Sequence, residues 1–200
     1  ANYIRQLSTE ELYKWTLPFI TGTGDATLEI NPENPQPKPN VGPEFSGVAL
    51  GDDGEPYCVD KSMNMTSSDV KKTLMGLMPL IQERLKFLTE AAEMVHFMFT
   101  EPAVPPVEQL IPKKLDQAKT KEVLENAREF VAKVFELDHE GAENFAKAKA
   151  EELGIKLGDF MMPVRMAVTG SRISPPLIGS IAVLGKERAL ARLEKAIATL

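Results

Sequence analysis

Apolar residues recur at steps of three and four along most of this chain, and this spacing constrains the fold more than any other feature of the sequence. It matches the 3.6-residue turn of an α-helix and places apolar side chains on one face. Alternating strand patterns are absent outside a proline-rich stretch near the start. The pattern therefore predicts an all-α fold class. The clearest apolar stripe, between 79 and 99, consists of Ile81, Leu85, Leu88, Ala92, Val95 and Phe99.

Local signals give the expected starts and ends of the helices. The Ser8 hydroxyl can accept from the backbone N–H of Glu11, while the Glu11 side chain reaches back to the N–H of Ser8. This capping box predicts a first helix over 9–17, before Pro18. N-cap candidates at 66–69 precede a helical pattern from 70 that is interrupted at Pro79, which suits a first helical turn. The remaining helices are expected over 79–99, 116–135, 138–153, 159–167, 175–184 and 186–199.

Residues 21–65 have a different composition and are expected to form an irregular, proline- and acid-rich insertion, with a short hairpin around 47–59. A second proline cluster at 101–106 marks a boundary between two helical units. The sequence thus predicts two successive helical bundle subdomains. The first covers 1–105 and includes the insertion, and the second covers 106–200.

Composition excludes several classes of protein. The chain has 200 residues, of which 43% are hydrophobic, enough for substantial cores. No uncharged apolar run approaches the roughly 18 to 20 residues that span a bilayer. The single cysteine, Cys58, cannot form an internal disulfide, and two histidines are too few for a typical zinc site. We therefore expect a cytoplasmic, metal-free protein without a membrane segment. Because the chain begins at Ala1, we also expect it to be a piece of a longer protein.

The net charge of −6 conceals an asymmetry. Between 21 and 60, eight acidic residues against one lysine give −7, whereas between 160 and 200 six basic residues against two acidic ones give +4. Charges are screened over about 8 Å at physiological salt, so a basic end can attract phosphates on an acidic protein. No catalytic constellation is visible, and His96 is expected at the edge of the core.

Two features leave a structural and a functional interpretation open. Arg84 follows Ile81 by three residues, which in a helix would place its guanidinium on the flank of the apolar stripe. There it either forms a salt bridge or presents a planar fork to a base or a phosphate. In the second feature, Arg165 lies near two helix starts, one at Pro163 and one at Ser174-Pro175. This arrangement is either simple helix punctuation or a site for an acceptor-rich partner.

Six segments, taken in order, carry a resemblance: Tyr3–Ser8 (YIRQLS), Glu83–Glu90 (ERLKFLTE), Leu153–Gly158 (LGIKLG), Pro163–Gly170 (PVRMAVTG), Ser174–Leu177 (SPPL) and Leu184–Arg188 (LGKER). They resemble the C-terminal, all-helical anticodon-binding region of bacterial-type glutamyl-tRNA synthetases. The match covers 1–19 and 70–200. The stretch between them does not match and is expected to be a lineage-specific insertion.

The resemblance implies roles for individual residues. Arg84 matches the arginine that reads the third anticodon base, a cytosine, and Arg165 matches a second anticodon-contacting arginine. Ser174, Pro175 and Leu177 match the helix start against which unstacked bases lie, and Lys147 falls at a basic contact position. We assign Arg188 and Arg192 to tRNA phosphates because they are basic and close in sequence.

The function implied is recognition of the tRNA(Glu) anticodon by a non-catalytic region. The parent enzyme would be a class I glutamate–tRNA ligase that uses ATP and magnesium on a catalytic domain outside this chain. The region itself is expected to be inactive alone, to bind no cofactor, metal, DNA or membrane, and to be a monomer. The alternative is a helical protein-interaction module that recruits a partner through the acidic insertion.

Overall fold

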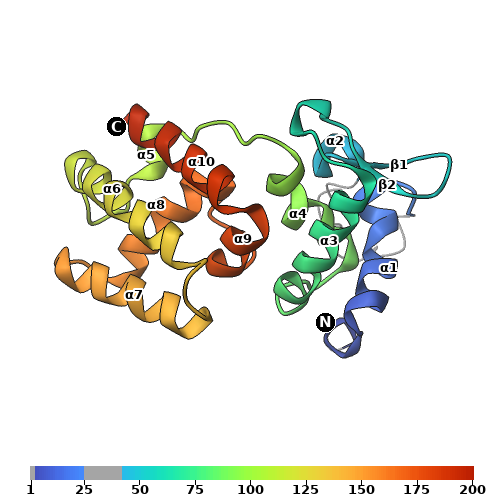
Figure 1. Cartoon of the computed structure of the whole chain (residues 1–200), viewed down its shortest axis with the longest axis horizontal. Coiled ribbons are helices and arrows are strands. Elements are labelled where there is room, and N and C mark those ends of the chain that lie inside the picture. Colours follow the sequence, from blue (N-terminus) through green and yellow to red (C-terminus); the bar gives the residue numbers. More distant parts are fainter. Residues whose placement is uncertain (1–2, 25–41) are drawn as a thin grey trace, which may run out of the picture. The chain divides into compact units, whose positions relative to one another are not determined.

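The computed structural model describes residues 3–24 and 42–200, which divide into a first unit, Ala1–Glu101, and a second unit, Pro102–Leu200 (Figure 1). The division falls inside the proline cluster at 101–106. The all-α fold class is confirmed, since the strands in the described part are confined to one short hairpin. None of the described helices combines the length and the apolar character needed to cross a bilayer.

The core of the first unit lies where α1 packs against α3 and α4. Leu12 and Ile20 of α1, Leu74 and Met78 of α3 and Phe99 of α4 are fully buried. The short helix α2 packs on α4, and the hairpin packs on α1 and α3. The elements are η1 (Ile4–Gln6), α1 (Thr9–Thr21), α2 (Pro43–Ser46), β1 (Val48–Leu50), β2 (Pro56–Cys58), η3 (Lys61–Met63), α3 (Ser67–Gln82), η4 (Leu88–Glu90) and α4 (Ala91–Phe99).

The hairpin expected around 47–59 is present. Strands β1 and β2 pair antiparallel, with Val48 opposite Cys58 and Leu50 opposite Pro56. Gly47 begins it in a left-handed conformation, with φ of 77°, and a Cβ there would lie 2.8 Å from the carbonyl oxygen of Phe99. Only glycine fits such a close approach. Gly47 follows α2 directly and lies against Phe99 of α4, so the start of the hairpin is packed on the core. This part of the expected insertion therefore belongs to the packed unit. Residues 25–41 lie outside the described part.

Capping boxes start both long helices of the first unit. The predicted one is confirmed, with Ser8 N donating to Glu11 Oε2 at 2.8 Å and Glu11 N donating to Ser8 Oγ at 3.3 Å. At α3, Thr66 N donates to Asp69 Oδ2 at 2.9 Å and Asp69 N donates to Thr66 Oγ1 at 3.1 Å. Hydrogen bonds from the Thr66 hydroxyl and then from its N–H hold the pKa of Asp69 below its ordinary value. Each box satisfies backbone donors that a helix start leaves unpaired.

Thr66→Ala is expected to lower the free energy of unfolding by about 1 kcal/mol, because it removes the N-cap acceptor of α3. Ser68→Ala, which changes an exposed hydroxyl in the same turn, is expected to change it by less than about 0.5 kcal/mol. Urea unfolding at pH 7 measures both. The depressed Asp69 pKa also adds stability above the unfolded-state pKa, and this is lost as the pH falls through the folded-state value. Equal stability of the two variants would contradict the capping role.

Three helices run through prolines at which helix boundaries were expected. Helix α1 continues past Pro18 to Thr21, and α3 continues through Pro79 from Ser67 to Gln82. Helix α8 (Leu157–Thr169) contains Pro163 in its interior, so the predicted helix start at Pro163 is wrong. The predicted end at residue 17 and the predicted break at 78–79 are therefore wrong. A proline removes one helical hydrogen bond, but Met78 and Ile81 beside Pro79 are fully buried. Burial of the apolar face on both sides of the proline offsets the missing bond.

The helix expected over 79–99 is instead two helices. Helix α3 ends at Gln82, and after a turn and η4 the chain enters α4 at Ala91. Glu90 Oε2 accepts from the backbone N of Lys86 at 2.8 Å and from that of Phe87 at 3.3 Å. These N–H groups therefore have a carboxylate partner in place of a helical carbonyl. The apolar stripe continues across the break. Its spacing therefore correctly indicated which residues are buried, but it did not indicate one continuous helix.

The second unit is a helical bundle around α8. Phe130 of α6 and Phe160 of α8 are fully buried and meet edge to face, with ring centroids 5.8 Å apart. Helix α10 packs on α6 and α8. Arg128 joins α6 to α10 through a two-point contact with Glu194, Nε to Oε1 at 2.6 Å and Nη2 to Oε2 at 2.7 Å. The elements are α5 (Val107–Leu110), α6 (Gln117–Lys133), α7 (His139–Glu152), α8 (Leu157–Thr169), α9 (Leu177–Leu184) and α10 (Lys186–Thr199).

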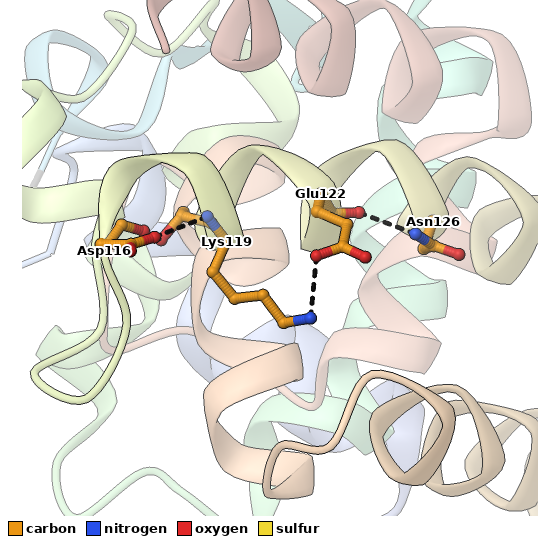
Figure 2. A network of polar contacts seen from close by, with 5 residues as sticks. Asp116, Lys119, Glu122 and Asn126 are labelled. Atoms are coloured by element: carbon orange, nitrogen blue, oxygen red, sulfur yellow. Dashed lines mark hydrogen bonds and ion pairs between the residues drawn. The ribbon is translucent and has the colours of Figure 1, made fainter.

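Polar contacts organise the first turns of α6 (Figure 2). The Asp116 carboxylate accepts from the backbone N of Lys119 at 2.7 Å, which caps the helix. The Lys119 ammonium reaches Glu122 one turn later at 2.8 Å, and the Glu122 carbonyl accepts from Asn126 at 2.9 Å. The cap and these contacts stabilise the helix that carries Phe130 into the core.

Candidate functional site

Arg84 lies in the turn that follows α3, and it is exposed. Its backbone N donates to Ile81 O at 2.8 Å, which closes the last turn of the helix. Within residues 3–24 and 42–200, its guanidinium has no ion pair and no hydrogen bond. The predicted place on a helix flank is wrong because the helix ends before Arg84. The salt-bridge interpretation finds no support, since the adjacent Glu83 pairs with Arg5 at 3.7 Å.

The turn that carries Arg84, residues 83–87, is fixed on both sides; we call it the Arg84 turn. On one side, Gln82 Nε2 donates to the carbonyls of Ile4 at 2.9 Å and Leu7 at 2.7 Å, which holds η1 against the end of α3. Leu85 anchors the turn itself and is only 2% exposed. On the other side, the Glu90 carboxylate binds the N–H groups of Lys86 and Phe87. The backbone therefore holds Arg84 in a defined place.

Arg165, on α8, is half-buried and binds the segment before α9. Its Nη1 donates to the Ser174 hydroxyl, to Pro175 O at 2.9 Å and to Ser174 O at 3.5 Å. These contacts join the last turns of α8 to the chain nine and ten residues later. In this structure, Arg165 therefore holds the 170–176 segment in place, and its predicted contact with an anticodon base stays a prediction.

The residues expected to lie against unstacked bases are buried. Ser174 and Leu177 are each 2% exposed, and Pro175 is buried as well. The helix begins at Leu177 with Pro176 as its N-cap, so the predicted N-cap at Ser174 is wrong. Consecutive prolines explain this, because a residue that precedes proline is disfavoured in the helical conformation. Buried side chains offer little surface to a base, so this placement does not support direct stacking on Pro175 or Leu177.

The surface of this segment comes from residues that the sequence did not single out. Ile173 is 74% exposed and Arg172 is exposed beside it. Hydrogen bonds inside the turn fix both, since Ile173 N donates to Ser171 Oγ at 3.1 Å and Thr169 Oγ1 donates to Ser171 O at 3.0 Å. The sequence did contain a signal for Ile173. It is an apolar residue in a turn bounded by glycine and proline, where no helix face is available to bury it.

The basic residues assigned to phosphates or to further contacts differ in exposure. Arg192 is 3% exposed, and its Nη1 donates to Val168 O at 2.7 Å. The guanidinium is enclosed between α10 and α8, so this placement does not support the predicted phosphate contact, which stays a prediction. Arg188 is half-buried on α10. Lys147 is exposed on α7, with Glu143 3.6 Å away. The contacts predicted for Arg188 and Lys147 stay predictions.

The structure places Arg84 in the first unit and Arg165 in the second. Each unit nevertheless contains an ordered turn with exposed cationic and large apolar side chains, one around Arg84 and one around Arg172.

Two other polar features lie outside these turns. His96 is half-buried at the edge of the core, as expected, and its Nδ1 lies within hydrogen-bonding distance of Phe45 O. A cavity of about 300 Å³ lies over β2 and η3 and includes Tyr57, Lys61 and Asn64. None of the predicted site residues lines it.

Comparison with known proteins shows which family this chain belongs to. A family model described as "Anticodon binding domain" matches residues 51–197. The glutamate–tRNA ligase of Treponema denticola is 47% identical over 199 residues, which cover 99% of this chain and 36% of that protein. The glutamate–tRNA ligase of Treponema pallidum (strain Nichols) is 36% identical over 98% of this chain and 34% of its own length. This chain therefore spans about a third of the length of these curated relatives.

A solved glutamate tRNA ligase from Elizabethkingia meningosepticum, in complex with its amino acid, has a similar fold. Its TM-score is 0.53 at 18% identity, and the match covers 100% of this chain and 31% of that one. The expectation that the family match leaves out the stretch between 19 and 70 is wrong. The family model begins at 51, and the alignment with the Treponema denticola protein covers 99% of this chain.

Proposed function

Because this chain belongs to the anticodon-binding domain family, we propose that it recognises the anticodon of tRNA(Glu) as the C-terminal part of a glutamate–tRNA ligase. The observation that carries the proposal is the family match over 51–197 together with the alignment of nearly the whole chain to glutamate–tRNA ligases. No observation favours the alternative of a protein-interaction module.

The physical support comes from the exposed turn residues. Proteins read single-stranded RNA by stacking unpaired bases on planar or apolar side chains and by hydrogen-bonding their Watson–Crick edges. Arg84 and Arg172 offer exposed guanidiniums, and Ile173 offers an exposed apolar surface. Both turns are fixed by hydrogen bonds, so little conformational entropy is lost when a nucleotide binds.

We propose that Arg84 reads the third anticodon base. Arginine carries only donors, which complement the O2 and N3 acceptors of cytosine. Guanine at that position presents N1–H and N2–H donors, which would face the arginine donors and repel them. Arg84 is suited to this role because no carboxylate in the described part of the chain neutralises it. Arg165 serves the same recognition by holding the Arg172–Ile173 turn.

Glutamylation of the tRNA, with its requirement for ATP and magnesium, is proposed for the part of the parent enzyme that this chain does not contain. The residues of this chain bind and orient the tRNA; we propose no cofactor for them. We also propose that the protein acts as a monomer in the cytoplasm.

The direct test is binding to an RNA hairpin with the tRNA(Glu) anticodon stem and loop, measured by fluorescence anisotropy at several salt concentrations. We expect tighter binding to this hairpin than to one in which guanine replaces the third anticodon base. Affinity should fall as salt rises, since lysine and arginine contacts to phosphates release counterions. Equal affinity for both hairpins and for an unrelated hairpin would contradict the proposed function.

A further inference from the structure

Phe87 is a large apolar side chain that the first unit does not bury. Its exposed fraction is 48%, although the apolar side chains on either side of it in sequence, Leu85 and Leu88, are buried and half-buried. Isolated exposed apolar residues are common on protein surfaces and need no explanation by themselves. The surroundings of Phe87 therefore decide whether its ring has a function.

The charges around Phe87 favour an anionic partner. Arg84 and Lys86 are both exposed, and within the described residues neither has an ion pair. Two carboxylates lie nearby: Glu83 is 3.7 Å from Arg5, and Glu90 accepts from the N–H groups of Lys86 and Phe87. With Arg5 counted, three cations outnumber these two carboxylates, so the local charge stays positive. The Arg84 turn therefore combines two cations and an aromatic ring.

The backbone that carries the Phe87 ring is also held in place. The Phe87 backbone is extended, with φ of −128° and ψ of 149°, and its N–H donates to Glu90 Oε2 at 3.3 Å. Leu85, 2% exposed, and Thr89, 4% exposed, anchor the chain two residues before and two residues after it. The backbone that carries Phe87 is therefore held in place, which limits the entropy lost when its ring stacks on a ligand.

We infer that Phe87 is a stacking surface for an unpaired nucleobase next to the base that Arg84 contacts, with Lys86 beside a phosphate of the same strand. The inference rests on the proposed function and adds a residue to it. An aromatic ring flanked by cations is the usual arrangement for single-stranded nucleic acid, because every base has a face that can stack. Stacking would contribute affinity with little dependence on base identity, whereas Arg84 would contribute selectivity.

The first test is Phe87→Leu, which keeps apolar volume but removes the flat ring. We expect about tenfold weaker binding to the anticodon hairpin, and the same loss for the hairpin with third-base guanine. Phe135→Leu is the matched control, because Phe135 is 42% exposed and lies in the second unit, beyond the end of α6. It should leave affinity unchanged. Thermal unfolding of both variants checks that neither loses structure.

The second test reports stacking directly. The chain has one tryptophan, Trp15, so Trp15→Phe gives a background without tryptophan. Phe87→Trp in that background places the only indole on the Arg84 turn, and hairpin binding is expected to quench its fluorescence. Phe135→Trp in the same background should show no quenching.

The outcomes separate the inference from the proposed function. Hairpin binding by the Trp15→Phe background, without quenching at position 87, would overturn the stacking role and leave anticodon recognition standing. Absence of hairpin binding by the unaltered chain would overturn both. Quenching at position 87 together with loss of affinity in Phe87→Leu supports the inference.

Discussion

Arg192→Ala is expected to lower the free energy of unfolding of the second unit by about 2 to 4 kcal/mol. The side chain is only 3% exposed, so its removal leaves a cavity between α10 and α8. It also leaves the carbonyl of Val168, which now accepts from Arg192 Nη1 at 2.7 Å, without that donor. Urea or thermal unfolding measures the loss.

Arg188→Ala is the matched control, since Arg188 is a half-buried arginine on the same helix. Its effect on stability is expected to be clearly smaller than that of Arg192→Ala. If Arg192→Ala instead kept full stability and weakened binding to every hairpin with a shallower salt dependence, Arg192 would be a phosphate contact and not a structural residue.

Arg84→Gln is expected to reduce selectivity against third-base guanine by about 10- to 100-fold, equivalent to losing about 1 to 3 kcal/mol of discrimination. Glutamine offers one donor group and one acceptor, so it can pair with either base, whereas arginine pairs only with the acceptors of cytosine. Stability should not change, because Arg84 is exposed and its guanidinium has no partner in the described part of the chain. Competition between the two hairpins for the same protein measures the selectivity.

Lys86→Gln controls for charge at the Arg84 turn. It removes one exposed cation two residues away and should weaken binding to both hairpins equally. The proposed reading of the third base would be contradicted if Arg84→Gln behaved like Lys86→Gln, with lower affinity and unchanged selectivity.

Local chemistry was predictable from the sequence where a few neighbouring residues decide it. The Ser8–Glu11 capping box, the hairpin near Gly47 and the start of α10 at Lys186 all follow from side chains within a few positions. The same approach failed at Pro18 and Pro79. There the burial of residues distant in sequence outweighed the local cost of a proline inside a helix.

Arg84 and Arg192 show most clearly what the sequence could not predict about the candidate site. Each lies at helical spacing from apolar neighbours, Arg84 after Ile81 and Arg192 after Ala189, so the pattern alone treats them alike. The structure exposes one and buries the other, because α3 ends before Arg84 whereas α10 continues through Arg192 and packs on α8. Phe87 and Ile173 were missed for the same reason, since exposure depends on what packs against a residue.

The sequence by itself determined the helical class of this protein, the caps of its helices and the likeness to anticodon-binding regions, because these depend on residue types and short spacings. Only the tertiary structure decided which arginines face the solvent, which proline-containing helices continue, and that Arg165 holds a turn whose tip carries Arg172 and Ile173. Burial and hydrogen-bond partners come from segments far apart in the chain, and no local pattern specifies them.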